Sequence, residues 1–210
     1  MKKRACLWLL ALCLLSGCGS AAAPAPAAEA AAQTQEAEAG AGLSATQLAS
    51  EPRPLMEEEI LAAYDRAEEA YGWFDLDPLP STGEALPLDG ADYYQVDYPG
   101  METLEDLRAY LRRLFSAELT DELLSLGGES PYYRDVDGAL HVSFSGRERD
   151  AGKGASRVEA VQLDSRTYAL EVSVELLNEA GDAVTGLECW SFPYSYVDGR
   201  WVFTEFQLVS

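Results

Sequence analysis

The chain has 210 residues, and its 15 basic and 36 acidic side chains give a formal net charge of −21 at neutral pH. This charge disfavours nucleic acid, or an anionic membrane surface, as a ligand of the folded part. It favours a cationic partner, although an acidic surface can also serve solubility alone.

The first residues have the features of a bacterial lipoprotein signal. The basic residues 2–4 precede an apolar run, Ala5 to Leu15, that is too short to span a bilayer as a helix. The sequence LSGC then ends at Cys18 and resembles a lipobox, in which the peptidase cuts before a cysteine that carries diacylglycerol. We predict a signal peptide over 1–17, lipidation of Cys18 and a membrane-anchored, extracytoplasmic protein. The alternative is an ordinary secretory signal with an incidental cysteine.

Residues 18–52 are predicted to be a disordered tether behind the lipidated cysteine. Fourteen of the 32 residues from 19 to 50 are alanine and none is aromatic, so the segment cannot bury enough apolar surface to fold. As a flexible coil it would reach roughly 30 Å. Loss of the signal leaves 12 basic and 36 acidic side chains, a net charge of −24. It also leaves Cys189 without a cysteine to pair with, and we expect that residue to be buried in a strand.

Residues 53–210 are predicted to be one domain whose first half is helical. A helix is expected from Pro54 to Gly72, with one apolar face formed by Met56, Ile60, Tyr64, Ala67 and Tyr71. Residues 75–92 are rich in Pro, Asp and Gly and predict a loop, and 93–98 a short strand. Thr103 and Asp106 indicate the cap of a second helix. The inward residues of this helix and of a short third one are Leu104, Leu107, Leu111, Leu114, Phe115, Leu119, Leu123 and Leu124.

The second half of the domain has the period of two that is typical of strands. Apolar residues alternate through TYALEVSVELL, 167–177, and further strands are expected at 158–163, 184–197 and 201–208. Helices followed by antiparallel strands predict an α+β fold, with N-terminal helices packed on one face of a curved antiparallel sheet. By analogy, this would be the cone-like layout of NTF2-like or cystatin-like domains.

The stretch RDVDGALHV contains two acids and His141, the only histidine of the chain. Its spacing does not fit a calcium loop, and one histidine cannot supply a transition-metal site. Asp137-Gly138 instead favours a type I′ hairpin turn. We therefore predict no metal, and treat Asp135 and Asp137 as candidate contacts of an exposed acidic turn with a protein partner.

Basic residues are concentrated in the glycine-containing segment 145–156. Arg147, Arg149 and Lys153 are candidate contacts with a partner or an anion, and the alternative is a solvated hairpin loop. On a later strand, aromatic side chains share one face, and this pattern is typical either of a core beneath helices or of a pocket for a small molecule. They are Trp190, Phe192, Tyr194 and Tyr196. No nucleophile elbow, zinc signature or nucleotide fingerprint is present in the sequence, so we predict neither catalysis nor a cofactor.

A series of motifs over residues 54–210 resembles one known family. They are a first helix that ends in YGWF with Trp73, the strand YxVxYPG, the helix TLEDLRAYLRRLF, the turn YRDVDG and the tail DGRWVFTEF. In this order they resemble the bacterial DL-endopeptidase inhibitors of the IseA type, in a lipoprotein-borne form. The resemblance implies a non-enzymatic protein that binds the catalytic domain of NlpC/P60-type cell-wall endopeptidases and restrains peptidoglycan cleavage. Characterised members are secreted and free, whereas this chain is predicted to be anchored. A small-molecule-binding or sensing lipoprotein is the alternative function.

Overall fold

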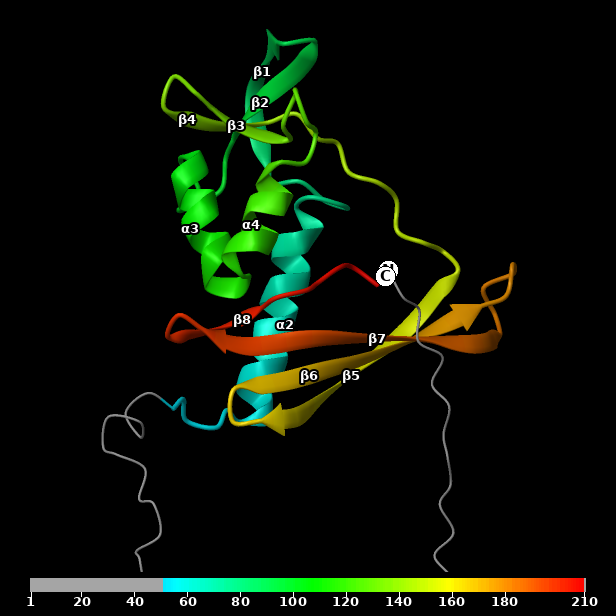
Figure 1. Ribbon diagram of the computed structural model, residues 1–210. Coiled ribbons are helices and arrows are strands. Elements are labelled where there is room, and N and C mark those ends of the chain that lie inside the picture. The colour runs from blue at the N-terminus through cyan, green and yellow to red at the C-terminus, as the bar shows by residue number, and fades with distance from the viewer. Residues whose placement is uncertain (1–50, 210) are drawn as a thin grey trace, which may run out of the picture. The chain divides into compact units, whose positions relative to one another are not determined.

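The computed structural model describes residues 51–209, which form a compact unit (Figure 1). The predicted signal peptide, Cys18 and the tether up to residue 50 lie outside the described residues. Within the described part, three helices and two four-stranded antiparallel sheets confirm the α+β fold class. None of these helices is long and apolar enough to cross a membrane.

Sheet A is built from two hairpins in the strand order β1-β2-β4-β3. Its strands are β1 (Ser81–Leu88), β2 (Ala91–Val96), β3 (Tyr133–Val136) and β4 (Ala139–Val142). The hairpins close at Asp89-Gly90 and Asp137-Gly138, and all four turn residues have the positive φ of a type I′ turn. The predicted turn at Asp137-Gly138 is thus confirmed, whereas the predicted loop over 75–92 is wrong from residue 81. Pro87 and Gly83 are tolerated there because β1 is an edge strand.

Sheet B has the strand order β5-β6-β7-β8. Its strands are β5 (Lys153–Asp164), β6 (Thr167–Leu177), β7 (Val184–Val197) and β8 (Arg200–Phe203). The alternation predicted for β6 is confirmed, since its inward side chains are buried from Tyr168 to Val174. The last predicted strand ends early, at Phe203, because Phe206 and Val209 turn into the core.

The three helices begin where capping groups satisfy their first backbone amides. α2 (Glu57–Gly72) starts later than predicted: Met56 is its N-cap residue and is 62% exposed, so Met56 is not part of the apolar face. Glu59 Oε2 accepts a hydrogen bond from the Met56 amide at 2.9 Å. In α3 (Leu104–Leu114) the predicted capping box of Thr103 and Asp106 is confirmed. α4 (Ala117–Leu124) follows after two residues, and the Ser116 hydroxyl accepts a hydrogen bond from the Leu119 amide at 3.2 Å.

Phe206 joins the helices to sheet B. Its ring lies 4.9 Å from that of Phe192 on β7 and 5.1 Å from that of Phe203 on β8, measured between centroids. On its other sides it meets Tyr64 of α2 at 5.5 Å and Phe115, after α3, at 5.8 Å. The tail after β8 therefore completes the core between the helices and the sheet, which stabilises the domain through buried aromatic area.

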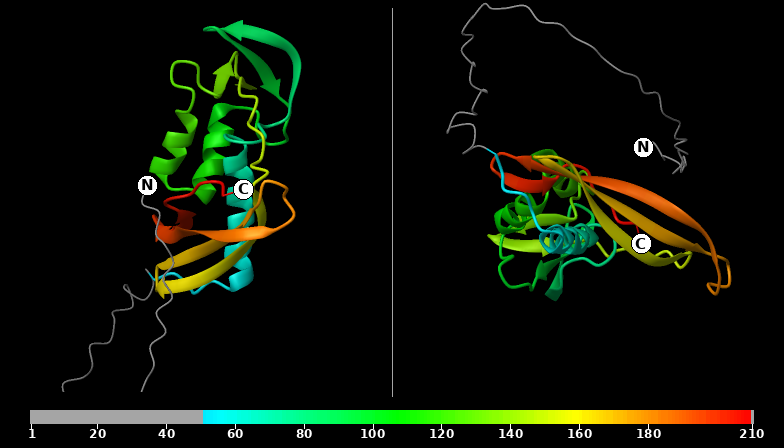
Figure 2. Two further views of the ribbon diagram at one scale, coloured as in Figure 1. Left: turned by 90° about the vertical axis from the view of Figure 1, so that its right-hand side faces the viewer. Right: turned by 90° about the horizontal axis from the view of Figure 1, so that it is seen from below.

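The sequence predicts one sheet, whereas the structure has two. The strands expected at 93–98 and around Asp137 pair with each other, through Gln95 and His141, and not with the strands of the second half. In two views sheets A and B lie at opposite ends of the helical layer (Figure 1, Figure 2). The chain enters at the sheet B end, where Ser165 Oγ donates to Glu51 at 3.5 Å. This places the turns of sheet A far from the point of entry.

Candidate functional site

The candidate site is a pocket of about 260 Å³ between the end of β2 and the β3–β4 turn. Its lining consists of Gln95, Val96, Asp97, Tyr98, Pro99, Met101, Glu102, Gly138 and Ala139. Seven of these nine residues belong to one continuous segment, which includes the motif YxVxYPG and its Pro99-Gly100 turn. The β3–β4 turn supplies the other two residues.

Backbone hydrogen bonds hold the two parts of the pocket together. The amide of Leu140 on β4 donates to the carbonyl oxygen of Glu102 at 2.7 Å, and the amide of Asp97 donates to that of Pro80 at 2.7 Å. Within the turn, the Met101 amide donates to the Tyr98 carbonyl oxygen at 3.1 Å. Gly100 has φ of 80°, a conformation that glycine adopts without strain. The pocket is thus supported by the fold on both sides.

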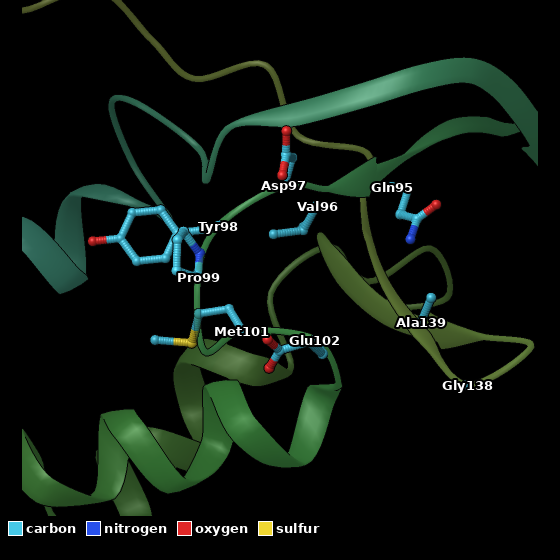
Figure 3. A pocket seen from close by; sticks show the side chains of 9 residues that line it. All are labelled: Gln95, Val96, Asp97, Tyr98, Pro99, Met101, Glu102, Gly138 and Ala139. Carbon is cyan, nitrogen blue, oxygen red and sulfur yellow. The ribbon is translucent and has the colours of Figure 1, made fainter.

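The pocket combines an apolar base with acidic sides. Val96 and Met101 are buried, and the Tyr98 ring lies 5.8 Å from that of Trp73 behind it. Asp97 and Glu102 are exposed and extend on opposite sides of Val96 (Figure 3). No basic side chain belongs to the lining. Such a pocket suits a group with an apolar stem and a cationic end, because carboxylates attract the charge while the base contacts the stem.

The two predicted acidic contacts differ in role. Asp135 Oδ1 accepts a hydrogen bond from the Leu104 amide at 2.7 Å, so this carboxylate caps α3 from a different part of the chain. Asp137 is exposed in the turn beside the pocket. His141 lies half-buried on β4, with Nδ1 3.0 Å from the Ala139 carbonyl oxygen. Within residues 51–209, no three His, Cys, Asp or Glu side chains are grouped to hold a metal ion.

Two of the three predicted basic contacts, Arg147 and Arg149, lie at a second, shallower hollow of about 400 Å³, lined by 76–77 and 145–149, whereas Lys153 lies outside it on β5. Arg147 makes a two-pronged ion pair with Asp75, through Nε at 2.9 Å and Nη2 at 2.5 Å, which raises the pKa of the guanidinium. Arg149 lies 3.9 Å from Asp77, and Lys153 is paired with Glu188. Each predicted cation therefore has a carboxylate beside it, which weakens this hollow as a site for an anion.

The aromatic residues of β7 are divided between the core and its margin. Phe192 and Tyr194 are buried, with Phe192 packed against Tyr64 of α2 at 6.4 Å between ring centroids. Trp190 and Tyr196 are half-buried. Phe192 and Tyr194 thus follow the interpretation of a core beneath helices, whereas Trp190 and Tyr196 lie at the margin of that core. Cys189, on the opposite face of β7, is exposed, so the expectation that it is buried is wrong: none of the helices within residues 51–209 covers that face of sheet B.

Asp97 and Glu102 were not identified from the sequence. A signal for them exists, because they flank the Pro99-Gly100 turn and each directly follows an apolar residue, Val96 or Met101. In a chain with 36 acidic residues, however, a pair of acids carries almost no information until the turn brings them to one hollow. No protein-family model matches the chain, and no curated protein matches it.

Proposed function

We propose that this chain is a membrane-anchored, extracytoplasmic lipoprotein that binds a cell-wall DL-endopeptidase of the NlpC/P60 type and restrains peptidoglycan hydrolysis. The observation that carries the proposal is the pocket with Asp97 and Glu102 on either side of an apolar base. It would receive a basic group on the surface of the enzyme. The protein acts by binding and not by catalysis, and it uses no cofactor.

The distribution of charge supports a basic partner. Glu29, Glu36 and Glu38 are the only acids in the sequence before residue 51, so the folded domain carries nearly all of the 36 acidic side chains. A field of this sign speeds the approach of a basic enzyme and disfavours anionic competitors. The hollow beside Arg147 and Arg149, where cations are already paired, offers no comparable attraction.

The position of the pocket supports a tethered mode of action. The first described residue, Glu51, lies beside the β5–β6 turn, whereas the pocket lies at the sheet A end. A tether from Cys18, with a reach of roughly 30 Å, would join the domain at Glu51 and so leave the pocket free for an enzyme that acts on the wall.

A hydrolysis assay tests the proposal directly. The protein from residue 19 onward is mixed with an NlpC/P60-type endopeptidase and purified peptidoglycan, and release of soluble fragments is followed. We expect hydrolysis to fall as the protein is added, and the effect to weaken at high salt because screening shortens the range of the charges. Unchanged hydrolysis at large excess, with several such enzymes, would refute the proposed function.

A further inference from the structure

β5 leaves one edge of sheet B open. Among the described residues it pairs with β6 alone, and its other side presents backbone groups that no strand of the unit meets. The pairing is irregular near both ends, between Lys153 and Ser156 and between Gln162 and Asp164, but it is continuous from Ser156 to Gln162. A regular open edge of this length is a template for another strand unless the protein protects it.

The side chains of this edge carry a balanced pair of charges on an otherwise acidic domain. Arg157 and Glu159 lie on the same face of β5, with Nη2 and Oε1 2.7 Å apart, and their side chains are 77% and 56% exposed. Glu159 also lies directly opposite Glu171 on β6, which is an unfavourable pairing of like charges. A second cation on the open side of Glu159 would offset that repulsion.

We propose that a second copy of this chain supplies that cation, by adding its own β5 antiparallel to this edge about a twofold axis at Val158. In this register Arg157 of each copy lies opposite Glu159 of the other, so the four charges alternate across the axis. Val158 meets its own counterpart, and Ala155 lies opposite Val161. Sheet B of one copy then joins sheet B of the other in one continuous eight-stranded sheet, since each copy contributes four strands.

Neighbouring registers do not give this match. An axis at Arg157 or at Glu159 places like charges opposite each other, and an axis at Ala160 pairs Glu159 with Val161. The charges of the edge are therefore complementary to the same edge of a second copy in one register. This self-complementarity is why we assign the edge to a second copy and not to an unrelated strand. The net negative charge of the domain opposes the association, so we expect a weak dimer that is favoured by moderate salt.

Charge reversal tests both the dimer and its register. The oligomeric state of the protein from residue 19 onward is measured by sedimentation over a range of concentrations, with reductant present because Cys189 is exposed. We expect a monomer–dimer equilibrium for the wild type. Arg157→Glu and Glu159→Arg should each raise the dissociation constant at least about tenfold, since each change acts twice across the axis.

Mixing the two variants distinguishes the register from a loss of folding. An equimolar mixture of Arg157→Glu and Glu159→Arg should form a heterodimer, because the all-acidic edge of one faces the all-basic edge of the other. The double exchange in one chain should restore the homodimer. Glu179→Arg, a matched charge change in the exposed β6–β7 connection, should leave the equilibrium unchanged. A wild type that stays monomeric at all concentrations, or a mixture that does not associate, would overturn the proposal, whatever the outcome of the hydrolysis assay.

Discussion

The carboxylate of Asp135 accepts a hydrogen bond from the backbone amide of Leu104 at 2.7 Å and so caps α3 from the β3 strand. A cap of this kind contributes about 1 kcal/mol to the free energy of unfolding. We expect Asp135→Ala to lower that free energy by roughly 1 kcal/mol in urea unfolding. Asp137→Asn, two residues further on, should change it little, because Asn also tolerates the positive φ of the turn. Equal losses at both positions would contradict the capping role.

The hydroxyl of Tyr133 connects two loop residues that are far from it in sequence. It donates to the Trp73 carbonyl oxygen and accepts from the Leu79 amide, both at 2.9 Å, and the residue is 2% exposed. Burial also raises the pKa of this phenol. Tyr133→Phe leaves a buried amide without its partner, so we expect a loss of about 1–3 kcal/mol by calorimetry or urea unfolding. Tyr132→Phe, half-buried and next in sequence, is the matched control.

Glu59 gives the stability of the α2 start a defined pH dependence. The Arg53 guanidinium and the Met56 amide lower the pKa of Glu59 to about 2. Because this pKa lies below the usual value of about 4.3, the charged carboxylate stabilises the fold above that pH and loses the effect as pH falls toward 2. Glu59→Gln should therefore be less stable than the wild type at neutral pH, and the difference should vanish near pH 2. A difference that stays constant with pH would argue against the ionised form as its source.

Gly146 lies where a side chain has no room. Its φ is +77°, and a Cβ atom there would lie 1.7 Å from the Leu76 carbonyl oxygen. We expect Gly146→Ala to cost more than about 2 kcal/mol, since it strains the backbone and moves the loop that carries Arg147 away from Asp75. Gly72→Ala, where nothing lies within 4 Å, should change stability by less than about 1 kcal/mol. Urea unfolding of both variants tests this: the free energy of unfolding should fall more for Gly146→Ala than for Gly72→Ala, and equal losses would contradict the steric explanation.

The two carboxylates of the pocket should contribute to partner binding through charge. Asp97→Asn and Glu102→Gln are each expected to weaken binding to the endopeptidase by roughly twofold to fivefold at low salt, and less at high salt. Asp92→Asn, on β2 and outside the pocket, carries the same loss of charge and serves as the control. Titration of the enzyme at two salt concentrations separates a local effect from the total charge. Equal weakening by all three variants would assign the effect to the overall field.

Local signals in the sequence predicted the helices and the turn at Asp137-Gly138. The capping box at Thr103 and the alternation of β6 depend on neighbours along the chain, and both are confirmed. The hairpin at Asp89-Gly90 was missed, because its flanking strand contains Pro87 and Gly83 and does not alternate. The role of Asp135 could not be read from the sequence either, since its partner amide lies 31 residues away. The pocket depends on the same kind of long-range contact, between the Leu140 amide and the Glu102 carbonyl oxygen.

The buried tail after β8 restricts where a tag can be fused to this protein. Phe206 occupies the centre of the aromatic core and Val209 is 5% exposed, so a tag fused behind residue 210 would begin at a segment that packs inside the domain. Glu51, in contrast, is exposed where the described chain begins. Affinity tags, fluorophores and attachment to a sensor surface are therefore best placed ahead of residue 51. Attachment from that side would also leave the pocket between β2 and the β3–β4 turn accessible to a partner.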